Sequence, residues 1–175
     1  LQTKLVLTTS LALIVFGTLA LLPLGRSNLP DAFFQSVTAR TAGFNTIEIK
    51  KLQPGGQFLL TALMIVGGSP ASTAGGFKTI TLAVLVLSVW ATLRRRDNVE
   101  AFGRTLALET LRRAAALVIL FLALLVLVTL ALSLAQPRES LAELLFESAS
   151  ACGTVGLSTG LTASTSLTTA GKYIL

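Results

Sequence analysis

The chain has 175 residues, of which 53% are hydrophobic and 13% are charged, and its formal net charge is +6. It has no histidine and a single cysteine, Cys152, which argues against histidine-based catalysis or metal binding and excludes an internal disulfide bond. The basic residues gather at 94–96, 104 and 112–113, between apolar stretches. This placement is typical of the cytoplasmic loops of membrane proteins, so the positive charge does not indicate nucleic-acid binding.

The apolar pattern predicts an all-α membrane protein with polar loops between its helices. In chain order we expect a span at 5–24, a short helix at 31–39, a loop at 40–46, a broken span at 57–93, an interfacial helix at 99–113, a span at 114–135, a second short helix at 140–149, a second loop at 150–159 and the start of a last span at 171–175. The two unbroken spans carry no charge and reach the ~20 residues that a bilayer crossing needs. The mixed charges of 99–113 are typical of a surface helix, and Ser140 with Glu143 predicts a capping box.

Two segments that each follow an apolar span resemble one another. Residues 34–46 read FQSVTARTAGFNT and residues 146–159 read FESASACGTVGLST, with one extra residue in the second copy. Carbonyl oxygens can replace the hydration shell of a cation only where the backbone is bent and unpaired. Such backbone is tolerated within a membrane where it lines a cavity or is buried in protein. One glycine alone would indicate a helix C-cap, but Gly43 and Gly156 share a context, which favours two ion-selectivity loops.

A run of small residues, GGSPASTAGG at 67–76, interrupts the apolar stretch 57–93. A phosphate-binding loop needs glycine directly before its Lys-Ser/Thr pair, but Phe77 separates Gly76 from Lys78, so we do not predict nucleotide binding. A kink is the simpler alternative, because Gly and Pro are common in membrane helices. However, the run is longer than a kink requires, and it favours an intramembrane loop beside a cavity.

Together these segments resemble the Trk/Ktr/HKT superfamily of potassium transporters, specifically its KtrB-like members. The residues that carry the resemblance are 34–46, GGSPASTAGGFKT at 67–79 and GTVGLSTGLT at 153–162. The resemblance implies repeats of helix, pore loop and helix around one pore, as in potassium channels, with a broken second helix. Residues 1–98 would form the third repeat and 99–175 an incomplete fourth. The chain lacks an initial Met and stops as an apolar run begins, so we interpret it as a C-terminal fragment.

The resemblance also implies which residues form the site. Potassium would bind backbone carbonyls of two filter loops, formed by Thr41, Ala42, Gly43 and Phe44 and by Thr154, Val155, Gly156 and Leu157. The gate would be an intramembrane loop formed by Gly67, Gly68, Ser69, Pro70, Ala71, Ser72, Thr73, Ala74, Gly75 and Gly76, with Lys78 at its end. We expect the Phe44 and Leu157 side chains to wedge the filter loops against the surrounding helices.

Three charged residues lie near these loops, and for two of them the sequence leaves two roles open. Lys78 either lines the permeation route or extends to the cytoplasmic interface, and we favour the second. Arg40 has no counterpart in the second loop and is expected to anchor the first short helix to an acid elsewhere. Glu147 either adds negative potential behind the second loop or only hydrogen-bonds to its neighbours.

The function implied is passive transport of potassium through a four-loop filter, with or without sodium dependence, and with no enzymatic reaction and no covalently bound cofactor. The resemblance implies a homodimer in the plasma membrane, most simply the inner membrane of a prokaryote, in contact with lipid and with a cytosolic nucleotide-binding regulatory ring. Two alternatives stay open: a sodium- or proton-coupled secondary carrier, in which broken helices also bind ions, and a non-conducting membrane scaffold subunit.

Overall fold

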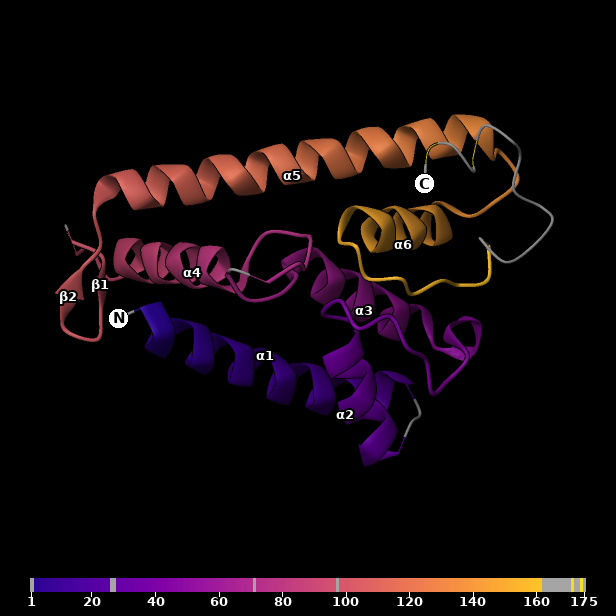
Figure 1. Cartoon of the computed structure of the whole chain (residues 1–175), viewed down its shortest axis with the longest axis horizontal. Coiled ribbons are helices and arrows are strands. Elements are labelled where there is room, and N and C mark those ends of the chain that lie inside the picture. Colours follow the sequence, from indigo (N-terminus) through magenta and orange to yellow (C-terminus); the bar gives the residue numbers. More distant parts are fainter. Residues whose placement is uncertain are drawn as a thin grey trace.

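The protein is described here by a computed structural model that covers residues 2–25, 28–70, 72–96, 98–161, 171 and 174. Within these residues it is an all-α membrane protein with six α-helices and one small β-hairpin (Figure 1). The elements are α1 (Gln2–Gly25), α2 (Leu29–Thr38), a short 3-10 helix (Ile49–Lys51), α3 (Pro54–Val66), α4 (Thr79–Leu93), β1 (Glu100–Ala101), β2 (Arg104–Thr105), α5 (Leu108–Ala135) and α6 (Leu141–Cys152).

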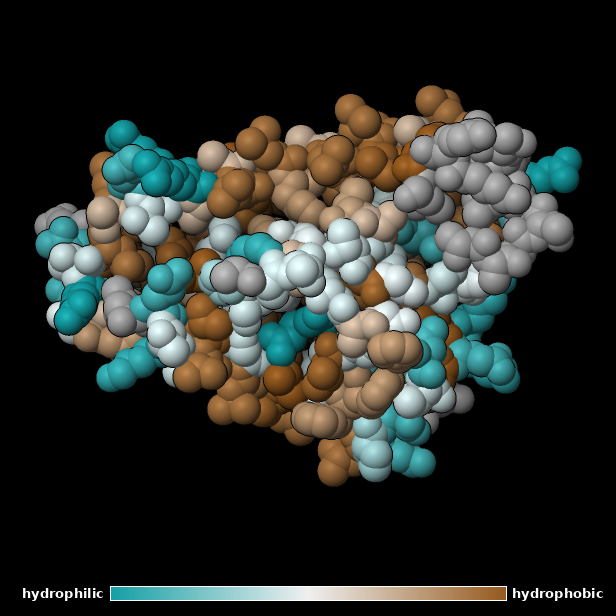
Figure 2. All heavy atoms as spheres, viewed as in Figure 1, coloured by the Kyte–Doolittle hydropathy of each residue, from teal (hydrophilic) through white to brown (hydrophobic). Residues whose placement is uncertain are grey.

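Helices α1 and α5 are the long elements and run along opposite sides of the molecule (Figure 1). They have 24 and 28 residues, which corresponds to about 36 and 42 Å of helix at ~1.5 Å per residue. Both exceed the ~30 Å hydrocarbon core of a bilayer. Their outer faces are apolar, with Leu11 64% and Ile119 67% exposed, and Figure 2 shows apolar surface along both edges of that view. These faces are suited to contact with lipid.

The apolar stretch 57–93 is divided into two helices, as the small residues at its centre predict. Helix α3 has 13 residues and α4 has 15, so each reaches only about 20 Å and neither crosses a bilayer alone. The connection between them lies at mid-length of the molecule in Figure 1. An irregular segment at this depth has to satisfy its backbone groups within the protein.

Helices α2 and α6 are short and occupy the same half of the molecule. Helix α2 packs against α1, where the Ser36 hydroxyl donates to the carbonyl of Ile14 at 3.0 Å. Helix α6 packs against α3 and α5. Its start has the N-cap half of the predicted capping box: the Glu143 N–H donates to Ser140 Oγ at 3.3 Å. The Glu143 carboxylate accepts from the Ser140 hydroxyl at 3.1 Å, in place of the backbone N–H that a complete capping box uses. The main buried cluster joins α2, α3 and α6 to Val155 and Leu157 of the second loop.

The predicted interfacial helix over 99–113 is wrong for its first part, which forms a β-hairpin. Glu100 pairs with Thr105 and Ala101 with Arg104, and the two-residue turn has φ of 49° at Phe102 and 73° at Gly103. Two positive φ values suit a hairpin turn, whereas Gly103 inside a helix would cost about 1 kcal/mol relative to alanine. Helix α5 takes up the rest from Leu108, with an ion pair between Glu109 and Arg113.

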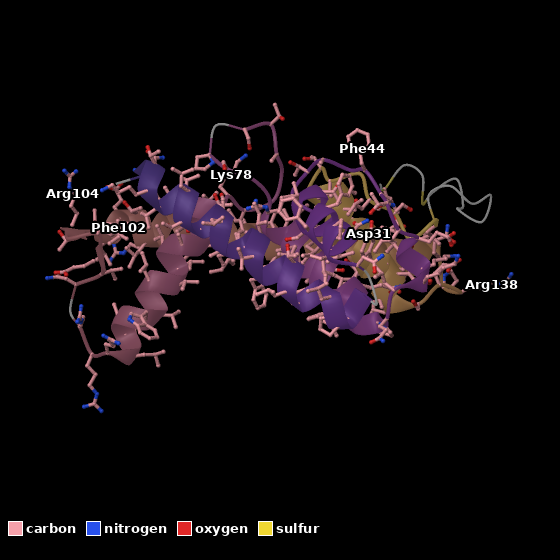
Figure 3. All side chains as sticks on the ribbon, turned by 90° about the horizontal axis from the view of Figure 1, so that it is seen from below. Asp31, Phe44, Lys78, Phe102, Arg104 and Arg138 are labelled. Atoms are coloured by element: carbon pink, nitrogen blue, oxygen red, sulfur yellow. The ribbon has the colours of Figure 1, made fainter. Side chains whose placement is uncertain are left out.

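The two ends of the molecule differ in charge, which predicts its orientation. Arg94 lies over the Trp90 ring at 4.7 Å, and Figure 3 shows Arg104 at the same end as Phe102, opposite Asp31 and Arg138. Because loops rich in Lys and Arg stay in the cytoplasm, we expect the end with Arg94–Arg96 to be cytoplasmic.

Cysteine labelling tests this orientation. In a Cys152→Ala background, a cysteine replacing the exposed Thr105 should react only with a membrane-permeant thiol reagent, because the hairpin would face the cytoplasm. A cysteine replacing the exposed Asn45, beside the first loop, serves as the control and should react with an impermeant reagent in intact cells. The reverse pattern would invert the proposed topology.

Candidate ion-selectivity loops and intramembrane loop

The two predicted filter loops have the same backbone conformation at matched positions. In the first, φ is 80° at Thr41 and 76° at Gly43; in the second, φ is 53° at Thr154 and 88° at Gly156. Threonine rarely takes a positive φ, because its β-branched side chain is crowded there. Strain of about 1–3 kcal/mol of this kind persists only where the surrounding structure enforces it. The repetition therefore indicates a shared backbone requirement in both loops.

The extra residue of the second loop is absorbed at the end of its helix. The Ala42 N–H donates to the Thr38 carbonyl at 3.1 Å, and the matching Val155 N–H donates to the Ser150 carbonyl at 2.8 Å, one residue further back. Gly153 is the inserted residue, and a Cβ there would lie 2.8 Å from the carbonyl oxygen of Ala149. The wider turn brings Thr154 and Gly156 into the positions that Thr41 and Gly43 have in the first loop.

The two loops lie side by side at their glycines. A Cβ added to Gly43 would lie 2.5 Å from the carbonyl oxygen of Val155, and one added to Gly156 would lie 3.5 Å from the Cα of Gly43. Both glycines are therefore at the point where the loops meet. Backbone carbonyls of the two loops share one small region, which is the arrangement that coordination of one ion requires.

The side chains that follow the glycines differ in burial. Leu157 is 1% exposed and packs in the main buried cluster, as the wedge role predicts. Phe44 is 71% exposed, and Figure 3 shows its ring pointing away from the molecule, so within the described residues it wedges nothing. Instead, the first loop is held by Thr38, whose hydroxyl donates to the Phe44 carbonyl at 2.8 Å and accepts from the Phe44 N–H at 3.0 Å.

The intramembrane loop is closed at its neck by backbone hydrogen bonds. The Phe77 N–H donates to the Ile65 carbonyl at 3.2 Å, and the Thr79 N–H donates to the Gly68 carbonyl at 3.0 Å. At the tip, the Ser72 hydroxyl donates to the Ser69 carbonyl at 2.6 Å. Ala71, assigned to this loop from the sequence, lies outside the described residues. The loop is thus an ordered turn that satisfies part of its own backbone.

This loop contacts the second filter loop directly. The Gly75 N–H donates to the Thr154 hydroxyl at 2.8 Å. A Cβ at Gly75 would lie 2.7 Å from both the carbonyl carbon and the carbonyl oxygen of Gly153, so only glycine fits there without displacement. The proposed gate and the second filter loop are therefore in direct contact.

Comparison with known proteins decides the family. Residues 3–175 match the family described as TrkH, cation transport protein. The chain belongs to the TrkH family. It is 34% identical to the Ktr system potassium uptake protein B of Vibrio alginolyticus over 99% of this chain and 40% of that protein. It is 36% identical to the Ktr system potassium uptake protein B of Bacillus subtilis, over 100% of this chain and 41% of that protein.

A further TrkH-like relative carries a different name. The chain is 41% identical to the potassium/sodium uptake protein NtpJ of Enterococcus hirae, over 84% of this chain and 33% of that protein. The TrkH-family chain thus spans about two fifths or less of the length of these curated relatives. The resemblance read from the residues is confirmed at the level of the family and of the Ktr proteins B.

In this TrkH-family chain Lys78 bonds to the intramembrane loop itself, and a place for it on the permeation route stays a prediction. Its ammonium group donates to the carbonyls of Ser72, at 3.1 Å, and of Ala74, so the side chain folds over the loop (Figure 3). Its charge interacts favourably with carbonyl dipoles at the tip of the loop, at Ser72, and just after it, at Ala74.

The structure also shows the surroundings of the Arg40 and Glu147 side chains. Arg40 Nε is buried without a hydrogen-bond partner among the described residues, so the acid expected to anchor it is not in this part of the chain. Glu147 is 2% exposed and hydrogen-bonds to Ser158 and Thr159, which favours the second of its two open roles.

Sequence reasoning did not assign a role to some residues that support the TrkH-type loops, although two of them lie within the repeated segments. Thr38 and Ser158 were not singled out, and the partner of Gly75 was not identified. A threonine near a helix end is a weak signal, because such hydroxyls commonly bond to nearby backbone. The contact between Gly75 and Thr154 joins residues far apart in the chain, and no periodicity reveals such a pair.

Proposed function

We propose that this chain supplies two filter segments of a potassium-conducting pathway through the membrane. The observation that carries the proposal is the pair of matched loops, in which Thr41 with Gly43 and Thr154 with Gly156 all have positive φ. Backbone of this kind turns successive carbonyls away from their usual hydrogen-bond partners. Carbonyls so released can replace the water around a dehydrated cation. The names of the Ktr relatives support potassium as that cation.

We further propose that the loop 67–76 controls passage below the filter. The bond between Gly75 and Thr154 holds the loop against the second filter segment, which supports a position for it next to the route of the ion. Its tip is exposed at Ser72 and Thr73, which leaves it free of packed side chains on one side. A segment with few buried apolar contacts opens at low free-energy cost.

The membrane location, the partners and the ion dependence of this activity are also proposals. The pathway would lie in the inner membrane of a prokaryote, with lipid against α1 and α5 and with the remaining filter segments supplied by the rest of a longer chain. We propose a homodimer with a cytosolic nucleotide-binding ring. The Ktr relatives are named as proteins of a Ktr system, which supports an assembly of more than one component. Sodium dependence is left open by the name of the Enterococcus hirae relative.

Growth at low potassium tests the proposed function. The complete protein, expressed in a cell without its own potassium uptake systems, should restore growth in micromolar potassium and should take up rubidium as a tracer. A protein whose loop 40–46 is replaced by a Gly-Ser segment of equal length is the matched control, inserted but without one filter segment. Failure of the complete, correctly inserted protein to support potassium or rubidium uptake would contradict the proposal and favour a scaffold.

A further inference from the structure

Glu147 is a buried acid on α6 that lies behind the second filter loop. Its side chain is 2% exposed, and its carboxylate oxygen Oε1 accepts three hydrogen bonds. The donors are the Ser158 hydroxyl at 2.7 Å, the Thr159 N–H at 2.8 Å and the Thr159 hydroxyl at 2.8 Å. An oxygen that accepts three donors is well suited to the negatively charged carboxylate, since hydrogen bonds to a charged acceptor are roughly twice as strong as neutral ones.

These bonds hold the C-terminal end of the second filter loop. Ser158 and Thr159 follow Leu157 directly, and Leu157 is 1% exposed in the main buried cluster. On the N-terminal side of Gly156, Val155 is 3% exposed and its N–H donates to the Ser150 carbonyl. The segment with Gly156 is therefore fixed at both ends, by the helix end before it and by Glu147 after it. A cavity of about 470 Å³ borders this segment and is lined by Glu147 and by residues 154–158.

The first loop has no such anchor. Gln35 stands where Glu147 stands in the other copy, after the phenylalanine and before the serine of FQS and FES. Its side chain is 0% exposed, yet both its carboxamide atoms lack hydrogen-bond partners among the described residues. Asn45 and Thr46, which follow the first loop, are exposed. The two copies thus share a backbone conformation but differ in how it is held.

We infer that Glu147 is a positioning residue for ion selection: through Ser158 and Thr159, its negative charge holds the second filter loop in the geometry that discriminates potassium from sodium. The inference rests on the proposed function. It follows because a filter distinguishes two cations by the number and placement of its carbonyls. A loop released at one end can move its carbonyls toward a smaller ion, so selection weakens before conduction is lost.

The test compares relative permeabilities of the complete, membrane-inserted protein. Glu147→Gln keeps the shape and one acceptor oxygen but removes the charge, and it should lower the potassium-to-sodium uptake ratio by about fivefold. Thr159→Val removes one donor and should lower the ratio less. In the double variant the two effects should not add, because both act through the same hydrogen bonds. Gln35→Met is the matched control, since losing an unpartnered carboxamide should leave the ratio within about twofold.

Each outcome has a defined meaning. If Glu147→Gln keeps the parent ratio, or if it and Thr159→Val act additively, Glu147 does not position the loop and the inference is overturned. If Glu147→Gln lowers uptake of both ions equally while Thr159→Val has no effect, the carboxylate acts only through its electrostatic potential, which also overturns it. Absence of uptake by the parent protein would count against the proposed function instead, because the ratio is compared only among proteins that transport.

Discussion

Gly43→Ser is expected to reduce selection of potassium over sodium more strongly than Gly156→Ser. Both positions have positive φ, 76° and 88°, where a side chain costs about 1–2 kcal/mol. They differ in their surroundings. A Cβ at position 43 would lie 2.5 Å from the carbonyl oxygen of Val155, so that carbonyl has to move; at position 156 the nearest atom, the Cα of Gly43, is 3.5 Å away.

The expected effect follows from which group moves. Serine at the first position displaces a carbonyl of the opposite loop, so one substitution perturbs both loops, and we expect at least about a tenfold fall in the potassium-to-sodium uptake ratio. Serine at the second position strains only its own loop. The ratio of tracer rubidium to sodium uptake, per inserted molecule, measures the difference.

A third glycine supplies the control for backbone strain. Gly103 has φ of 73°, and a Cβ there would meet nothing within 4 Å. Gly103→Ser therefore introduces similar strain in the β-hairpin, without touching a filter loop, and it should leave the uptake ratio unchanged. An equal effect of all three substitutions would reduce the role of the two loop glycines to general stability, and the filter assignment would fail.

Short-range patterns in the sequence predicted the parts of this fold that depend on neighbouring residues. The N-cap of α6 at Ser140, the break at Gly67 and the repeated Thr-x-Gly of the loops are each decided within a few positions. Such features are set by local backbone preference and by side chains that reach their own turn. Their presence could therefore be predicted without knowledge of the packing.

Two predictions failed because charge and burial patterns are ambiguous. The segment before α5 has both signs of charge, which suits a surface helix as well as a polar hairpin, and the turn at Phe102 and Gly103 decides for the hairpin. Phe44 was expected to wedge its loop against the surrounding helices, but it is 71% exposed. Whether an aromatic side chain is covered depends on which elements lie next to it, and the sequence of the loop does not contain that information.

The contact between the intramembrane loop and the filter is the feature that changes the mechanistic picture most. It could not be predicted, since Gly75 and Thr154 are 79 residues apart in the chain and meet where α3 packs against α6. The bond joins a backbone N–H of the proposed gate to a side chain of the proposed filter. Movement of the loop therefore has a direct effect on the filter, and the filter threonine influences how firmly the loop is held.

The second large effect is expected from Thr154→Val, which keeps the shape of the side chain and removes the hydroxyl that accepts from Gly75. One neutral hydrogen bond contributes about 0.5–1.5 kcal/mol net, so its loss should shift the loop toward its open position and raise rubidium flux by about two- to tenfold. Thr154→Ser retains the hydroxyl and should conduct like the parent. The modification rate of a cysteine introduced at Ser72, in a Cys152→Ala background, should rise in Thr154→Val alone.

Thr41→Val is the matched control, because Thr41 occupies the same place in the first loop and its hydroxyl has no hydrogen bond to the loop 67–76 among the described residues. Both valine variants remove one hydroxyl from the filter, so any direct loss of ion coordination is common to both. Only Thr154→Val also releases the loop. If both variants lower flux equally, and the cysteine at position 72 reacts at the parent rate in each, the bond between Gly75 and Thr154 does not restrain the gate. If flux and cysteine reactivity rise together in Thr154→Val and in neither control, the bond from Gly75 to the Thr154 hydroxyl holds the proposed gate closed.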